Sequence, residues 1–117
     1  MSNRTDPDLI EDILTCLSKI EQYTHGLSYE EFVDDTKTQD AIIRNLEVIG
    51  EASKQISYDI KGKYQSIPWK MIAGTRDRLI HGYFGVNIDI VWEIATVDVP
   101  VLEGEIKKIK KNISANE

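Results

Sequence analysis

Four side chains able to take part in chemistry, Arg76, Asp77, His81 and Tyr83, occur together in the run RDRLIHGYFG. Arginine presents a rigid, planar set of cationic donors that suits phosphate oxygens. Histidine gains and loses a proton near neutral pH, so His81 can serve as an acid or a base. On a helix Asp77 lies four residues before His81, where its carboxylate reaches the imidazole and favours the protonated ring. The alternative is ordinary polarity at a helix end, with the Asp–His pair stabilising the last turn.

These residue types suit the metal-free cleavage of RNA. That reaction needs a base for the ribose 2′-hydroxyl, an acid for the leaving 5′-oxygen, and a cation that stabilises the crowded phosphorane. One chain offers a single histidine here, because His25 lies in a separate helix-end loop. A symmetric dimer would bring two copies of Arg76 and His81 together and supply both proton-transfer roles. The sequence shows no metal-ligand spacing of His, Cys and carboxylates, so we expect no metal and no other cofactor.

Charge is distributed unevenly along the chain. The net charge of −6 speaks against a general nucleic-acid-binding protein, because an acidic surface repels phosphates. Residues 61–82, however, carry five basic side chains against Asp77 alone, which makes this segment net positive. Within it we expect Lys70 and Arg78 to contact substrate phosphates beside Arg76. The alternative is a solvated helix flank with no ligand.

Apolar residues that recur every three or four positions predict a helical chain. Two long helices are expected, over residues 8–23 and 38–57. A short helical turn is expected at residues 28–33, with Ser28 as its cap. Residues 58–66 form a looser stretch after the second long helix.

The segment that carries the chemistry is predicted to be a third helix, with Pro68 in its first turn and Gly82 at its end. A last helical region follows, which Pro100 splits in two, with Asp98 capping the second part. Residues 1–117 therefore predict one domain of the all-α class, a compact up-down bundle of four to five helices.

An unbroken third helix would put Arg76 in an apolar stripe that runs from Trp69 to Leu79. A buried arginine needs an anionic partner or a polar cavity, because an unpaired buried charge is very costly. One interpretation is a purely structural pair with a carboxylate such as Glu47 or Glu51. The other is an arginine that lines a reaction site.

Small residues favour contact between helices. Gly50 and Ala52 flank the apolar stripe of residues 38–57, which is close to a heptad pattern, and they allow another helix to approach closely. Gly74 leaves similar room in the third helix. With a chemistry that requires two histidines, these residues predict a homodimer.

No stretch approaches the roughly 18 consecutive apolar residues that a membrane span needs. The first residues lack the charged start and apolar run of a signal peptide. The single Cys16 cannot form an internal disulfide. We therefore expect a cytoplasmic protein without a membrane partner.

Three stretches of the chain resemble one known family. The run RDRLIHGYFGVNIDIVWEI resembles the Arg-x4-His-x-Tyr signature of the HEPN superfamily, specifically the HepT type of small toxin. The runs DAIIRNLEVIGEASKQI and IPWKMIAGTRDRLIHGYF resemble that family's long central helix and the segment after it. The stretches cover much of the chain in the expected order.

The resemblance implies an α-helical homodimer with a minimal nucleotidyltransferase antitoxin as partner, in a type VII toxin–antitoxin system. It implies a metal-independent endoribonuclease in which Arg76 and His81 are catalytic and form a composite site across the dimer. Asp77 stands where relatives often have Asn, as a supporting residue. Tyr83, two residues after His81, is the position to which the partner transfers AMP from ATP, which silences the toxin.

Two hypotheses from different classes therefore remain open. The first is an endoribonuclease toxin, which the intact Arg76 and His81 pair favours. The second is a catalytically silent binding module that dimerises and docks a nucleotidyltransferase, or binds nucleotide or RNA. The acidic net charge favours the second, because weak attraction for phosphate is typical of a weak nuclease.

Overall fold

The computed structural model describes residues 4–79 and 85–115, and within these ranges it contains helices and turns but no β-strand. The prediction of an all-α fold is confirmed. No described helix is long and apolar enough to cross a membrane. In chain order the elements are α1 (Asp6–Thr24), α2 (Tyr29–Val33), α3 (Thr36–Gln55), α4 (Tyr58–Lys63), α5 (Trp69–Ala73), α6 (Thr75–Leu79), α7 (Ile88–Glu93), the π-helical turn η2 (Ile94–Asp98) and α8 (Val99–Ala115).

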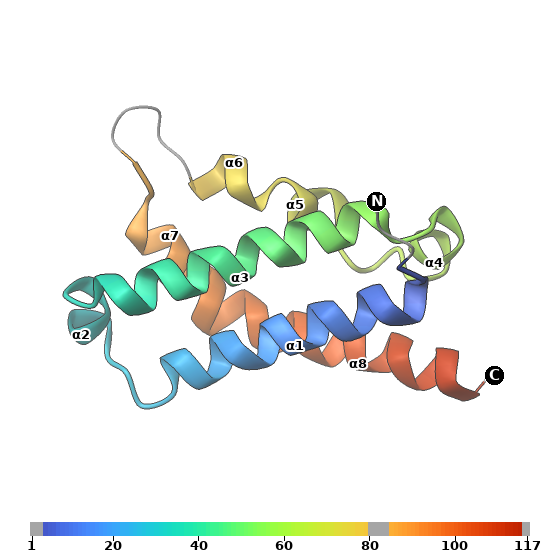
Figure 1. Ribbon diagram of the computed structural model, residues 1–117, viewed down its shortest axis with the longest axis horizontal. Helices are drawn as coiled ribbons and strands as arrows, with labels where there is room; N and C mark the ends of the chain where they lie inside the picture. The colour runs from blue at the N-terminus through green and yellow to red at the C-terminus, as the bar shows by residue number, and fades with distance from the viewer. Residues whose placement is uncertain (1–3, 80–84, 116–117) are drawn as a thin grey trace.

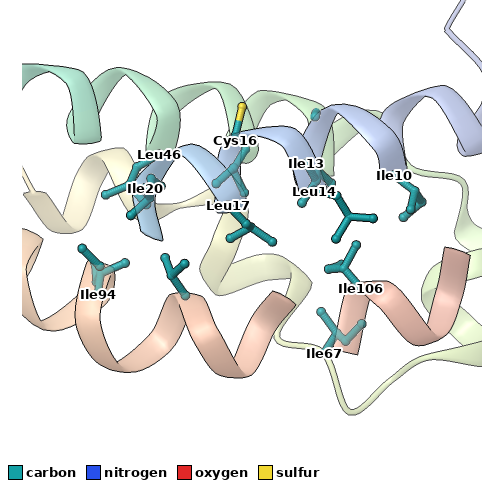
Figure 2. Close-up of a cluster of buried hydrophobic side chains, with 14 of the residues drawn as sticks. Ile10, Ile13, Leu14, Cys16, Leu17, Ile20, Leu46, Ile67, Ile94 and Ile106 are labelled. Carbon is teal, nitrogen blue, oxygen red and sulfur yellow. The ribbon is translucent and has the colours of Figure 1, made fainter. Parts of the chain in front are cut away.

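Three long helices form the body of the bundle (Figure 1). α1 packs against both α3 and α8, and α5 and α6 lie along α3. Burying an aliphatic side chain contributes about 1.5–3 kcal/mol, so these three helices hold most of the free energy of packing. Figure 2 shows the centre of this core, formed by Ile10, Ile13, Leu14, Leu17 and Ile20 of α1 with Leu46, Ile67, Ile94 and Ile106.

The first helices follow their sequence signals closely. α1 begins two residues before the predicted start, because Thr5 and Asp8 form a capping box ahead of the apolar stripe. α2 has the predicted cap, in which the Ser28 hydroxyl accepts from the Glu31 backbone N–H and the Glu31 carboxylate accepts from Ser28 N–H. Cys16 is a buried free thiol, and burial raises its pKa.

The stretch expected to be looser contains α4, so that prediction was wrong. The Ser57 hydroxyl accepts a hydrogen bond from Ile60 N–H and starts the helix. The Ser57 hydroxyl and the Ser57 backbone N–H also donate hydrogen bonds to the Asp6 carboxylate, at 2.6 and 3.0 Å respectively. This contact with the start of α1 orders a segment whose own composition is weakly helical.

The third helix is not continuous, which corrects a second prediction. α5 ends at Ala73, Gly74 has non-helical dihedral angles (φ −92°, ψ 9°), and α6 starts at Thr75. The reason lies in α3: a Cβ added at Gly50 would lie 3.3 Å from the carbonyl oxygen of Ile72. The backbone at the end of α5 is therefore in close contact with α3. The predicted end at Gly82 lies outside the described residues.

The last helical region stays helical past Pro100, which corrects a third prediction. Pro100 has no N–H to donate, and the chain accommodates this with the wide turn η2 rather than with a break. Asp98 belongs to that turn and does not act as an N-cap. From α7 the chain thus continues without a break through η2 into α8, which runs back along α1 (Figure 1).

Candidate active site

Arg76 lies on the surface of α6, and 70% of its side chain is exposed. The expectation that it belongs to a buried stripe was wrong. The break at Gly74 changes the register of α6 relative to α5, so that Thr75 and Leu79 are the residues of α6 that become buried. Arg76 therefore needs no partner to offset burial, and its guanidinium is accessible to a ligand.

One side of the Arg76 guanidinium nevertheless contacts a carboxylate of α3. Its Nε lies 3.7 Å from Oε2 of Glu47 on α3. Of the two predicted carboxylate partners, Glu47 makes this contact, whereas Glu51 pairs with Lys54 at 3.2 Å. Because the contact uses Nε, the two terminal nitrogens of the guanidinium stay available as donors.

A charged depression of about 410 Å³ lies between α3 and α5–α6. We call it the α3–α6 depression. Arg76 and Asp77 both line it, so the structure brings these two predicted site residues together. Its other lining residues are Arg44, Leu46, Glu47, Gly50, Glu51, Lys54 and Ala73.

Lys70 and Arg78 do not share this depression. Lys70 is exposed on α5 and is absent from the described residues that line it. Arg78 lies at a different, largely apolar groove of about 340 Å³ between α5–α6 and η2–α8, which we call the apolar groove. α6 therefore separates Arg76 from Arg78, and the sequence-based grouping of both with Lys70 on one phosphate-binding surface does not correspond to one cavity.

His81 and Tyr83 lie outside the described residues. The described chain on either side of them is well anchored, because Asn87 N–H donates to the carbonyl oxygen of Leu79 at 2.8 Å. The Asn87 side chain also accepts from Ile90 N–H and starts α7. Leu79 and Asn87, the described residues that flank these positions, thus lie side by side.

Contacts with α2 fix the position of α7, the first helix after these residues. The Tyr29 hydroxyl donates to the Asp89 carboxylate. The rings of Phe32 and Trp92 pack with centroids 5.0 Å apart, and Tyr29 meets Trp92 edge to face. Among the described residues, no group of three His, Cys, Asp or Glu side chains is arranged to hold a metal ion.

Sequence reasoning missed two cations of the α3–α6 depression, Arg44 and Lys54. The available signal was their position on α3: Arg44, Glu47, Glu51 and Lys54 follow one another at three- and four-residue spacing and therefore share one side of a helix. Gly50 lies within this series, at the point where α5 touches α3.

Comparison with known proteins identifies the family. A family model described as "Ribonuclease HepT-like" matches residues 13–109. The chain belongs to this ribonuclease HepT-like family. The resemblance stated from its sequence blocks is confirmed, and with it the prediction of a HepT-type member of the HEPN class.

Curated relatives match nearly end to end. A protein named probable ribonuclease HepT from Thermococcus cleftensis is 44% identical, over 92% of this chain and 98% of its own length. A putative RNase of Methanocaldococcus jannaschii is 43% identical over 100% of this chain and 97% of its own. A putative RNase of Caldanaerobacter subterraneus subsp. tengcongensis is 42% identical over 91% and 95%. No solved structure matches the chain significantly.

Proposed function

We propose that this protein is a metal-independent endoribonuclease and the toxin of a two-component toxin–antitoxin system. The observation that carries the proposal is the state of Arg76, a residue of the family's Arg-x4-His signature. It is exposed beside a charged depression, and Glu47 holds it through Nε. This geometry leaves two terminal nitrogens for the non-bridging oxygens of a phosphate. The names of the relatives support the same activity.

In the proposed reaction, a base removes the proton of a ribose 2′-hydroxyl, and the 2′-oxygen bonds to the adjacent phosphorus. The bond from phosphorus to the 5′-oxygen breaks, and an acid gives that oxygen a proton. Arg76 stabilises the charge that develops on the phosphorane. His81 carries the proton transfers, and Asp77, in the same depression as Arg76, supports the site.

A second copy of the chain supplies the second His81, so the site is composite across a homodimer. Because the site is shared, the face that the second copy covers includes the exposed side of α6 that carries Arg76. The close approach at Gly50 is already filled by α5 of the same chain and does not contribute to the dimer.

Modification of Tyr83 regulates the proposed ribonuclease activity. A nucleotidyltransferase antitoxin transfers AMP from ATP: the Tyr83 phenolic oxygen bonds to the α-phosphorus, pyrophosphate leaves, and the phenolic proton is released. The added phosphate and adenosine, seven residues along the chain from Arg76, compete with RNA for the Arg76 guanidinium. Tyr83→Phe should escape this silencing, and intact-mass spectrometry with antitoxin, ATP and magnesium measures it.

Cleavage of a single-stranded RNA by the purified protein tests the activity. Arg76→Ala and His81→Ala should each lower the rate by about a hundredfold or more, and EDTA should leave the wild type unchanged. Lys19→Ala, on the exposed side of α1, is the matched loss of one cation away from the site and should cleave normally.

The second candidate is a silent binding module, and one observation favours it: Glu47, Glu51 and Asp77 all line the α3–α6 depression and oppose phosphate. Absence of cleavage by the wild type, with toxicity in cells that survives both the Arg76 and His81 substitutions, would establish that alternative and end the nuclease proposal.

A further inference from the structure

The cations of the α3–α6 depression are not equivalent. Three of them line it: Arg44, Lys54 and Arg76. Lys54 pairs with Glu51 at 3.2 Å, and Arg76 pairs with Glu47 at 3.7 Å. Arg44 is exposed and forms no ion pair with any residue in the described ranges. Its charge is therefore the least compensated of the three.

The register of α3 against α5–α6 places Arg44 along the depression. Gly50 meets the backbone at Ile72, and Glu47 meets Arg76, so α3 and α5–α6 run in opposite directions. Figure 1 shows the same arrangement. Three residues further towards the start of α3, about 4.5 Å along its axis, bring Arg44 towards the end of α6 at Leu79.

This end of the depression is the one from which the chain continues to His81. Leu79 is the last described residue of α6, and its carbonyl oxygen accepts a hydrogen bond from Asn87 N–H. Lys54 lies two turns beyond Glu47 in the other direction, past the contact at Gly50. Arg44 and Lys54 thus stand at opposite ends, with Arg76 between them.

We propose that Arg44 is a substrate-binding residue: it binds an RNA phosphate next to the phosphate that Arg76 engages. Glu47, three residues from Arg44 on the same helix, contacts Arg76 at 3.7 Å, whereas no ion pair with a described residue engages Arg44. The two arginines come from different helices, so we assign each a phosphate of its own on a single strand. The inference rests on the proposed ribonuclease function and names part of its substrate site.

The test compares Arg44→Gln with Lys54→Gln, because each removes one positive charge from the same depression at opposite ends. Cleavage of single-stranded RNA should show a KM raised about tenfold or more for Arg44→Gln, with kcat nearly unchanged, since one charge-assisted contact to substrate is lost. Lys54→Gln should raise KM far less. Arg44→Lys should recover part of the loss, because a point charge replaces a bidentate fork. Circular dichroism checks that all three variants fold.

Binding without cleavage gives a second readout. In a His81→Ala background, fluorescence anisotropy with the same RNA should show that Arg44→Gln lowers the slope of log affinity against log salt concentration by about 0.7, the loss of one phosphate contact to a single strand. Equal effects of Arg44→Gln and Lys54→Gln on KM and on this slope would overturn the inference, as would an Arg44→Gln variant with the wild-type KM.

The two proposals fail in different ways. If the wild type cleaves RNA and Arg44→Gln behaves like the wild type, the role of Arg44 is refuted and the ribonuclease function stands. If the wild type cleaves no RNA, yet binds it with a salt slope that depends on Arg44, the ribonuclease function is refuted and the phosphate-binding role of Arg44 stands.

Discussion

The body of the bundle and the segment α5–α6 are held in place by different kinds of contact. α1, α3 and α8 pack through continuous apolar stripes, and their register follows from side chains that are almost fully buried. α5 and α6 are five residues each, and few of their side chains are buried, Trp69, Thr75 and Leu79. Their placement also involves the close backbone contact at Gly50 and the break at Gly74. The proposed chemistry lies on the second region. The first region fixes the fold, whereas small features of the second decide which side chains reach the solvent.

The largest expected effect on stability comes from the core. Leu17 has no exposed surface and lies at the centre of the cluster in Figure 2. Leu17→Ala should lower the free energy of unfolding by about 2–5 kcal/mol, because a cavity remains where the side chain was. Urea denaturation measures it. A loss below about 1 kcal/mol would mean that the bundle can collapse around this site and that the two regions differ less than we infer.

A smaller loss of stability should follow Gly50→Ala, which changes the contact between α3 and the end of α5. Its Cβ would lie 3.3 Å from the Ile72 carbonyl oxygen, so the end of α5 has to move. We expect a cost of about 1–3 kcal/mol and reduced RNA cleavage. Gly104→Ala on α8 is the matched control, because nothing lies within 4 Å of its added Cβ. It should stabilise the protein by about 0.5–1 kcal/mol. Equal thermal melting curves for the two variants would contradict the close contact.

Tyr29→Phe should weaken the attachment of α7 to α2 and lower the stability of the protein modestly. It removes the hydrogen bond to Asp89 and keeps the ring against Trp92. The free energy of unfolding should fall only slightly, because water competes for an exposed hydrogen bond. Tyr23→Phe is the control, since Tyr23 is a similarly exposed tyrosine with no side-chain hydrogen bond to the described residues. Thermal unfolding of the pair decides whether the Tyr29 hydroxyl contributes.

The smallest expected effect is a change in how the stability of the protein depends on pH when Glu21 is replaced. Burial, followed by the nearby Glu103 carboxyl group, raises the pKa of Glu21 above its ordinary value near 4.5, and its Oε1 is buried without a hydrogen-bond partner among the described residues. The folded state therefore holds this proton more tightly than the unfolded state, so the associated stability is present at low pH and is lost as pH rises past 4.5. Glu21→Gln should flatten the dependence of stability on pH above 4.5. A wild type and variant whose stability changes in parallel with pH would contradict a raised pKa of Glu21.

Much of the bundle follows from the sequence because its signals are local and agree with one another. The capping boxes at Thr5 and Ser28 and the apolar stripes of α1 and α3 each determine their element without help from the rest of the chain. The break at Gly74 does not follow in this way. It depends on α3 passing close to Ile72, a contact between residues more than twenty positions apart.

The residue types of the candidate site could be predicted from the sequence, but the solvent exposure of Arg76 could not. A continuous helix would bury Arg76, and the break exposes it, so the sequence pattern led to the wrong environment for the right residue. Glu47 was among the expected partners, because its charge and position on α3 were visible in the sequence. The role of Arg44 was not visible, since it depends on the antiparallel register of α3 and α6.

The central claim is that Arg76 acts in chemistry and contributes little to the fold. The most direct test measures RNA cleavage and thermal unfolding on the same preparation of Arg76→Ala. We expect the cleavage rate to fall by about a hundredfold, while the melting temperature stays within about 2 °C of the wild type, because an exposed pair with Glu47 adds less than about 1 kcal/mol. Unchanged cleavage, or a loss of activity matched by a loss of stability, would contradict the account.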